Sequence, residues 1–135
     1  MQLTRKSDYA IRCVLHLSGD PEAVASVEEI SRAMFLPKTF LAKILQSLMK
    51  AGIVRSTRGI KGGFQLAKRP KDINLLEVIE AIQGPSAPNI CAIDRKMCQL
   101  SGGCSVHPVW IKIKDIVEKE LKKTNFAVLS KRRRL

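Results

Sequence analysis

Residues 38–67 read KTFLAKILQSLMKAGIVRSTRGIKGGFQLA and contain one helical pattern followed by two strand patterns. Apolar residues first recur every three or four positions, as on one face of a helix, and Gly52 suits the C-terminal cap. Strand-like residues then occupy 53–57 and 64–67, on either side of a tip of glycines and cations at 58–63. A helix followed by a basic hairpin is typical of the recognition helix and wing of a winged-helix domain.

The residues before Lys38 predict the first half of a helix-turn-helix motif. Ser26 and Glu29 have the spacing of a capping box, which starts a short helix that runs to about Met34. A tight connection follows, and Pro37 suits the first turn of the next helix. Together the two helices and the hairpin predict a mainly α fold with a small β-hairpin wing.

Further helical patterns on both sides divide the chain into four parts. Apolar spacing predicts a helix over 5–18, and Asn74 is placed to cap a helix that ends at Gln83. The expected parts are a winged helix-turn-helix DNA-binding domain over 1–83, a cysteine-bearing cluster loop over 84–104, a dimerisation helix over 105–124 and a basic tail over 125–135.

The last long helix carries more apolar surface than a small domain needs for its own packing. Trp110, Ile113, Val117 and Leu121 lie at helical spacing on one stripe, which favours contact with a second copy of the chain. Docking of this stripe onto the chain's own core is the alternative. The tail from Phe126 is expected to be frayed, with non-specific attraction for phosphates.

The positive charge of the chain is concentrated in one window. The 135 residues include 24 Lys and Arg against 12 Asp and Glu, a formal net charge of +12. No acid lies between Ser31 and Lys71, the stretch called here the basic window. Phosphates neutralise such a surface, so the window predicts a face that binds double-stranded DNA, and a chance run of solvated cations is the alternative. The ten cations of the window are Arg32, Lys38, Lys43, Lys50, Arg55, Arg58, Lys61, Lys68, Arg69 and Lys71.

Three of the four cysteines share one loop. Cys91, Cys98 and Cys104 follow a C-x6-C-x5-C spacing, whereas Cys13 lies beside the apolar stripe of the first helix and is expected to be an inert packed thiol. Structural zinc sites normally use paired C-x2–4-C knuckles, which this loop lacks, while iron–sulfur clusters accept longer spacings and a ligand other than cysteine. A thiol–disulfide switch, or cysteines without a role, stay open as alternatives.

A metal centre on three thiolates leaves a fourth position open, and two residues are candidates for it. His107 follows Cys104 by three residues, and Asp8 in the first helix could reach the loop of a partner subunit. Each also has an ordinary explanation, because Asp8 can pair with Arg12 one helical turn on and His107 can be a polar first-turn residue.

The motifs taken together resemble those of a known family. They are Met1-Gln2-Leu3-Thr4, Asp8-Tyr9-Ala10, Phe40-Leu41-x-x-Ile44-Leu45, Ala51-Gly52-Ile53-Val54-x-Ser56-x-Arg58-Gly59, Gly62-Gly63-Phe64-x-Leu66-Ala67 and the three spaced cysteines. With these, nearly the whole chain resembles the Rrf-two family of winged-helix regulators, which includes IscR-like, NsrR-like and RirA-like members.

The resemblance implies a homodimeric transcription factor whose DNA affinity depends on an iron–sulfur cluster held by the three cysteines. His107 matches the fourth ligand of IscR-like members and Asp8 that of NsrR-like members, so a 2Fe–2S and a 4Fe–4S cluster both stay open. Thr39 and Phe40 match DNA-facing positions, and Arg58 matches the wing arginine that enters the minor groove. The candidate DNA-binding residues are thus Lys38, Thr39, Phe40, Lys43, Arg58 and Lys61.

The sequence therefore predicts a transcription regulator that binds a pseudo-palindromic operator as a homodimer. The same fold without a cluster, sensing by thiol oxidation, zinc or a protein partner, is the alternative. No signal peptide or membrane-spanning stretch is evident, so we expect a cytoplasmic protein without membrane contact. With two histidines and no catalytic constellation, we expect no enzymatic activity.

Overall fold

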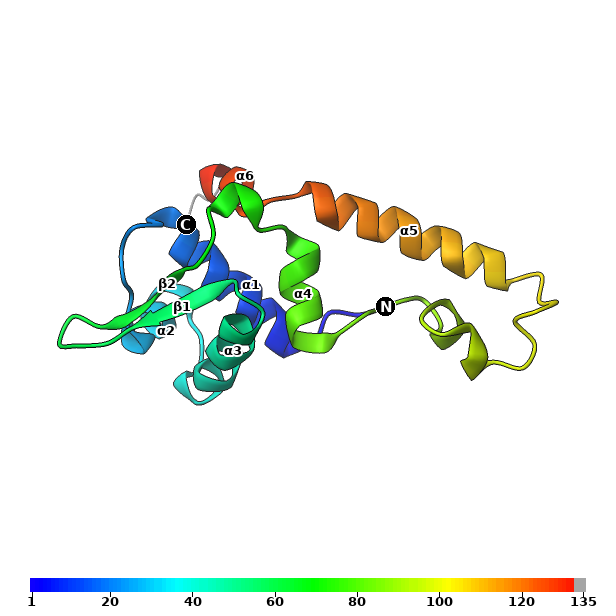
Figure 1. Ribbon diagram of the computed structural model, residues 1–135, viewed down its shortest axis with the longest axis horizontal. Coiled ribbons are helices and arrows are strands. Elements are labelled where there is room, and N and C mark those ends of the chain that lie inside the picture. Colours follow the sequence, from blue (N-terminus) through cyan, green and yellow to red (C-terminus); the bar gives the residue numbers. More distant parts are fainter. Residues whose placement is uncertain (133–135) are drawn as a thin grey trace.

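Four helices and a two-stranded sheet form a winged-helix head, from which a helical arm extends (Figure 1). This computed structural model describes residues 1–132. The head comprises α1 Arg5–Gly19, α2 Val27–Met34, α3 Lys38–Lys50, β1 Val54–Thr57, β2 Gly63–Leu66, the 3-10 turn η1 Pro70–Asp72 and α4 Leu75–Gln83. The arm, residues 84–124, comprises the 3-10 turns η2 Ile90–Ala92 and η3 Arg95–Met97 and the helix α5 His107–Lys123, and α6 Phe126–Arg132 returns to the head. The predicted fold class, mainly α with a hairpin wing, is confirmed.

The helices begin where short polar side chains accept the first backbone N–H groups. Thr4 accepts from the N–H of Ser7 at the start of α1, and Ser26 accepts from the N–H of Glu29 at the start of α2. Asn74 forms a complete capping box with the residue three positions on, as its placement predicts. These local signals fix the order and the starts of the helices in the head.

Helix α1 lies at the centre of the head and contacts α2, α3, α4 and α6. Its Ala10, Cys13 and Val14 are completely buried. The stripe predicted for α3 faces this centre, with Leu41, Leu45 and Leu48 among its buried members. Because the inner face of α3 is used for packing, its opposite face is left to solvent.

The wing is an antiparallel hairpin that is also joined to the loop before α2. β1 and β2 pair in register from Val54 opposite Leu66 to Thr57 opposite Gly63. Ala25 adds a single bridge to Phe64, with an N–H···O bond of 2.8 Å in each direction. The base of the wing is therefore fixed to the head, while its tip projects beyond it (Figure 1).

The wing glycines serve two different needs. Gly59 has a φ of 115°, the left-handed conformation expected for a hairpin tip. Gly62 and Gly63 do not have a positive φ. A Cβ on Gly62 would clash with the backbone oxygen of Thr57, and a Cβ on Gly63 with that of Ala25. These two glycines are thus required by close approach within the protein, which the hairpin pattern alone did not predict.

The expected frayed tail is helical as far as it is described. Phe126 is completely buried in the head, and its N–H donates to the carbonyl of Ile73 at 3.0 Å. Ser130 donates to the carbonyl of Ser18, at 3.3 Å, which ties α6 to the end of α1. Residues 133–135 lie outside the described residues. Helix α6 therefore closes the core of the head instead of trailing from it.

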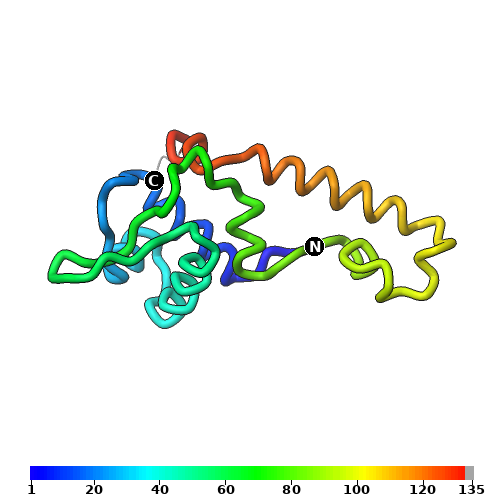
Figure 2. Tube along the Cα trace, viewed as in Figure 1, coloured from blue at the N-terminus to red at the C-terminus, as the bar shows by residue number. Residues whose placement is uncertain are grey.

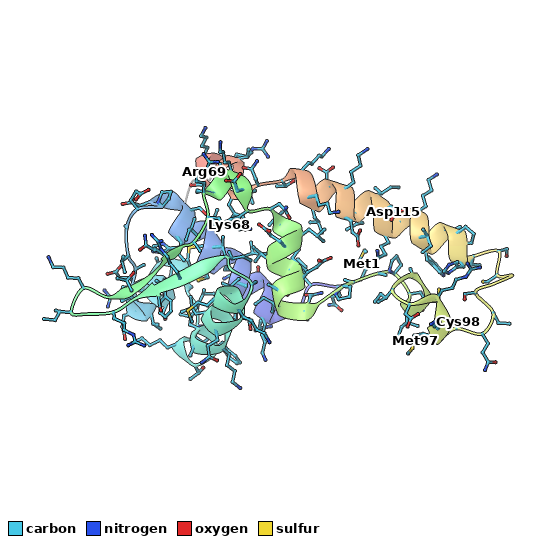
Figure 3. The ribbon with its side chains drawn as sticks, viewed as in Figure 1. Met1, Lys68, Arg69, Met97, Cys98 and Asp115 are labelled. Atoms are coloured by element: carbon cyan, nitrogen blue, oxygen red, sulfur yellow. The ribbon has the colours of Figure 1, made fainter. Side chains whose placement is uncertain are left out.

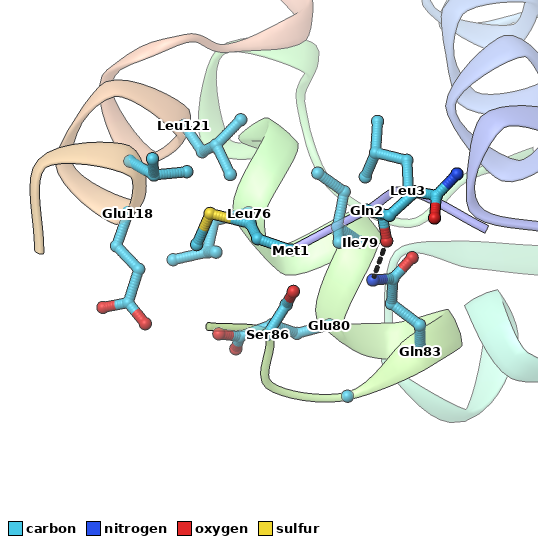
Figure 4. Close-up of a pocket in the computed structure, with 12 residues that line it drawn as sticks. Met1, Gln2, Leu3, Leu76, Ile79, Glu80, Gln83, Ser86, Glu118 and Leu121 are labelled. Atoms are coloured by element: carbon cyan, nitrogen blue, oxygen red, sulfur yellow. Dashed lines mark hydrogen bonds between the residues drawn. The ribbon is translucent and has the colours of Figure 1, made fainter. Parts of the chain in front are cut away.

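The arm leaves the head after α4, turns at its far end and comes back along α5 (Figure 2). Where α5 rejoins the head, a pocket of about 230 Å³ lies between α4, α5 and the first residues of the chain (Figure 4). Val117 and Leu121 line it, and Gln83 holds its edge by donating to the carbonyl of Gln2 at 3.2 Å. No helix within residues 1–132 is both long and apolar enough to cross a membrane.

Replacing Gly63 by Ala should destabilise the head by on the order of 2–3 kcal/mol, because the new methyl group meets the Ala25 carbonyl and breaks the bridge to Phe64. Urea unfolding followed by circular dichroism measures the loss. Gly102→Ala is the matched control, since a Cβ there meets nothing within 4 Å. Equal stability of the two variants would contradict the close approach.

Candidate functional site

The outer face of α3 presents polar and apolar side chains to solvent. Lys38, Thr39 and Lys43 are exposed, and Phe40 keeps 42% of its surface exposed. Gln46 lies one turn beyond Lys43 and is also exposed. An α-helix with such a face fits the major groove, where its side chains meet base edges and phosphates.

Phe40 is held partly by α1. Its ring lies 6.1 Å from the ring of Tyr9, measured between centroids and tilted by 51°. The guanidinium of Arg12 lies 6.0 Å from the Tyr9 ring centre and pairs with Asp8 at 2.9 Å. The Phe40 ring is thus supported on one side by Tyr9, which is itself held by Arg12, and the rest of the ring is open to solvent.

The wing tip carries cations around an apolar residue. Arg58, Ile60 and Lys61 are all exposed between the two strands. An arginine on a narrow projection can enter the minor groove, where the potential is most negative over A·T-rich steps. The head therefore offers two elements, α3 and the wing, for the two grooves of one duplex.

The basic window divides into two groups in space. Lys68 binds both carboxylate oxygens of Glu77 at 3.1 and 3.2 Å, and Arg69 binds Asp72 at 3.1 Å. Figure 3 shows Arg69 beside α6 and Lys68 near α4, both far from the wing tip. The seven cations on α2, α3 and the wing are exposed, and of these Lys38 has a distant contact, 3.8 Å, with Glu28. The expectation that all ten cations form one face is therefore wrong for the last members of the window.

Cys13 is a packed thiol, as its position predicts. It has no exposed surface, and burial raises the pKa of its thiol to about 12. A thiol with so high a pKa stays protonated at neutral pH and is a poor nucleophile and metal ligand. Thiol reactions and metal binding are therefore left to the three loop cysteines, Cys91, Cys98 and Cys104.

The three loop cysteines lie at the far end of the arm, each in a different local structure. Cys91 belongs to η2 and is 6% exposed, whereas Cys98 follows η3 and Cys104 precedes α5, both half-buried. Figure 3 shows Cys98 in the arm, far from the head. Ser101 orders the loop by donating to the carbonyls of Arg95 and Cys98 at 2.7 and 2.9 Å. Across residues 1–132, no three Cys, His, Asp or Glu side chains are close enough together to hold a metal ion.

The two candidates for a fourth ligand are placed very differently. The Nδ1 atom of His107, in the first turn of α5, is buried without a hydrogen-bond partner. Asp8 lies on α1 in the head and is paired with Arg12. Because the cysteine loop lies in the arm, Asp8 is remote from the loop of its own chain (Figure 1). An unpartnered buried nitrogen fits a metal ligand, because a bond to metal would satisfy it, but the three loop thiols are not gathered around it in this structure.

The apolar stripe predicted for α5 is divided between two faces. Trp110, Val117 and Leu121 are half-buried, and Val117 and Leu121 line the pocket against α4. On the same side Lys114 hydrogen-bonds Glu118 at 2.8 Å, which raises the pKa of Lys114. A second stripe, called here the outer stripe, is exposed and consists of Val106, Val109, Ile113 and Ile116.

Sequence reasoning missed two features of these surfaces. Gln46 carries no charge and was hidden by the count of cations, although its spacing from Thr39 and Lys43 places it on their face. Val106 precedes α5 and continues the outer stripe, but its polar neighbours disguised it. Helical spacing alone would have found both.

The sequence matches the Rrf2 family, described as "Iron-dependent Transcriptional regulator", over residues 3–132. An rrf2-like putative HTH-type transcriptional regulator of Rhodobacter capsulatus is 40% identical over 94 residues, 66% of this chain and 62% of that protein. A putative HTH-type transcriptional regulator of Aquifex aeolicus is 31% identical over 118 residues, 86% of this chain and 82% of that protein. NsrR of Shouchella clausii is 35% identical over 81 residues, 59% of this chain and 54% of that protein. The chain thus spans less than two thirds of the first and third of these relatives.

Two solved structures show the same fold. CymR, the global cysteine regulator of B. subtilis, aligns over 99% of both chains with a TM-score of 0.82 and 23% identity. T. potens IscR aligns over 98% of this chain and 89% of its own, with a TM-score of 0.79 and 24% identity. The match over residues 3–132, together with the winged-helix head and its basic face, shows that this chain belongs to the Rrf2 family of transcriptional regulators.

Proposed function

We propose that this protein is a homodimeric, sequence-specific DNA-binding transcription regulator whose DNA affinity is controlled by an iron–sulfur cluster. The observation that carries the DNA-binding half is the exposed surface from Arg32 through α3 and the wing, which carries seven cations and no acid, the nearest acids being Glu28 and Glu29 in the first turn of α2. The buried, unpartnered nitrogen of His107, three residues after Cys104 in the chain, supports the cluster.

In the proposed complex α3 lies in the major groove. Thr39, Phe40 and Gln46 face the base edges, and Lys38 and Lys43 meet phosphates on either side. Each phosphate that a cation meets releases a condensed counterion, so binding is steeply weakened by salt. Arg58 enters the adjacent minor groove with Lys61 at its edge, as the projecting wing allows.

The outer stripe of α5 is the proposed dimer interface. Its four side chains are exposed in one row, while the other apolar row of α5 already faces the chain's own loop and α4. Two copies joined through this row would present two α3 helices with two-fold symmetry. A pseudo-palindromic operator matches that symmetry, with half-site centres about 34 Å or a multiple of it apart.

The cluster is proposed to bind to Cys91, Cys98 and Cys104, with His107 as the fourth ligand and Asp8 of the partner subunit as the alternative. When bound, the cluster would supply a centre that responds to iron supply, redox state or nitric oxide. The loop joins the end of α4 to the start of α5, so ordering its thiolates changes how the arm meets the head. Both 2Fe–2S and 4Fe–4S clusters suit three thiolates and one further ligand.

Thiol oxidation without a cluster is the second candidate, and one observation favours it. Cys98 and Cys104 are half-exposed, as a thiol must be to react with an oxidant, and the three cysteines stand apart rather than gathered. Iron and sulfide analysis of protein purified without oxygen separates this candidate from the cluster.

Replacing Arg58 by Ala should weaken operator binding by about 1–3 kcal/mol, because the minor groove focuses negative potential on the wing arginine. Fluorescence anisotropy with a selected operator measures the change. Lys131→Ala on α6 is the control and should have a much smaller effect, since Lys131 is an exposed cation on another element. Losses of the same size would mean that the wing stays outside the groove.

Replacing Ile116 by Glu should convert the dimer to monomers, because the charge lies in the outer stripe, where Ile116 is 58% exposed in the single chain. Size-exclusion chromatography with light scattering measures the mass. Lys122→Glu changes charge on an exposed position of α5 outside this row and should leave the dimer intact. An Ile116→Glu variant that stays dimeric would move the interface elsewhere.

Replacing Cys91, Cys98 or Cys104 singly by Ala should abolish or severely weaken cluster binding, because each removes one of three thiolate ligands. Visible absorption of anaerobically purified protein, with iron and sulfide content, measures the cluster. Cys13→Ala is the control and should keep the wild-type spectrum, since Cys13 is sealed in the head.

The fourth ligand is tested by His107→Ala and Asp8→Ala, and we expect the histidine variant to change the spectrum and to lose the cluster faster in oxygen.

DNA selection with holo-protein and with the triple cysteine variant then tests regulation. Identical affinity and sequence preference of the two would remove the sensing role and leave DNA binding alone.

A further inference from the structure

The turn between α2 and α3 contains an unusual residue. Phe35 caps α2 in the left-handed conformation, with φ 56° and ψ 48°. Among residues 1–132 it is the one residue other than glycine with positive φ. A side chain strains the backbone in this conformation, which is why glycine usually occupies such caps. The phenyl ring is 88% exposed, so no packing within the described chain offsets the strain.

The backbone around Phe35 forces the ring outward. Met34 and Leu36, on either side, are buried in the core at 4% and 3% exposure. The N–H groups of Phe35 and Leu36 both donate to the carbonyl of Ser31, and the Ser31 hydroxyl donates to the carbonyl of Leu36 at 2.5 Å. The left-handed turn is therefore fixed by the burial of Met34 and Leu36 and by the hydrogen bonds of Ser31. As a result the Phe35 ring points into solvent.

The surroundings of the ring indicate its partner. Phe35 lies three residues before Lys38, where α3 begins, and Arg32 and Lys38 near it are exposed cations. A surface of this charge next to the first turn of a recognition helix meets a polyanion. The apolar group that a DNA duplex offers in the major groove is the C5-methyl of thymine, which accepts contact with an aromatic ring.

We propose that Phe35 is a specificity-determining DNA contact, whose ring packs on a thymine methyl group at the edge of each half-site beside the start of α3. The inference rests on the proposed DNA-binding function and adds a residue to it. Burial of the ring against DNA offsets both its exposure and the strain of its backbone.

The test compares Phe35→Gly with Phe35→Tyr on an operator selected from random duplexes by the wild-type protein. Glycine relieves the left-handed strain, so the melting temperature should stay unchanged or rise by a few degrees. Operator affinity should nevertheless fall by about tenfold, because the ring is gone, whereas Phe35→Tyr keeps a ring and should bind within about twofold of wild type. Phe35→Asn, which also tolerates this backbone, repeats the glycine result.

Deoxyuridine replaces each thymine of the operator in turn, which removes only the methyl group. One position in each half-site should weaken the wild-type protein by several-fold and leave Phe35→Gly unaffected. The inference is overturned if Phe35→Gly binds the operator as tightly as wild type, if it weakens operator and unrelated duplex equally, or if no thymine distinguishes the two proteins. A wild-type protein that selects no duplex at all would overturn the proposed function instead.

Discussion

The burial of α1 is the constraint on which the other surfaces depend. Its small residues Ala10 and Cys13 are completely enclosed, and α2, α3, α4 and α6 all pack around it. Because α2, α3, α4 and α6 all pack on α1, the apolar stripe of α3 can be buried in one orientation only. The opposite face of α3 is exposed to solvent as a consequence. The same helix contacts Phe40 through Tyr9, so the core and the surface proposed to face DNA both depend on one element.

Local signals in the sequence predicted the head well, and long-range contacts account for what they missed. Ser26 and Asn74 each accept a hydrogen bond from the backbone N–H three residues on, so both helix caps could be predicted from the local sequence. Helix α6 was not predicted, because its seven residues end in cations and its packing depends on the distant contacts of Phe126 and Ser130 with the head. The pairing of Lys68 with Glu77 likewise joins the segment after β2 to the first turn of α4, which charge counting cannot foresee.

The same distinction applies to the cysteine loop. The sequence places three thiols and a histidine in one segment, but their mutual geometry depends on η2, η3 and the start of α5. The two candidate fourth ligands differ in the free-energy change that binding a metal would bring. An orphaned buried nitrogen on His107 costs roughly 1–3 kcal/mol that a metal bond would recover, whereas Asp8 would give up an ion pair worth about 0.2–1 kcal/mol. The balance favours His107.

The return of α6 to the head has a consequence for how the protein is made. The core lacks Phe126 until the ribosome has extended the chain past that residue, so the head cannot close while only its own helices have emerged. The segment from Cys91 to Phe126 takes roughly 2–7 s to synthesise at about 5–20 residues per second. Cys91, Cys98 and Cys104 precede Phe126 in the chain, so they leave the ribosome before it does, while the core of the head is still open. Assembly of the loop and completion of the head therefore fall at the same stage of biosynthesis.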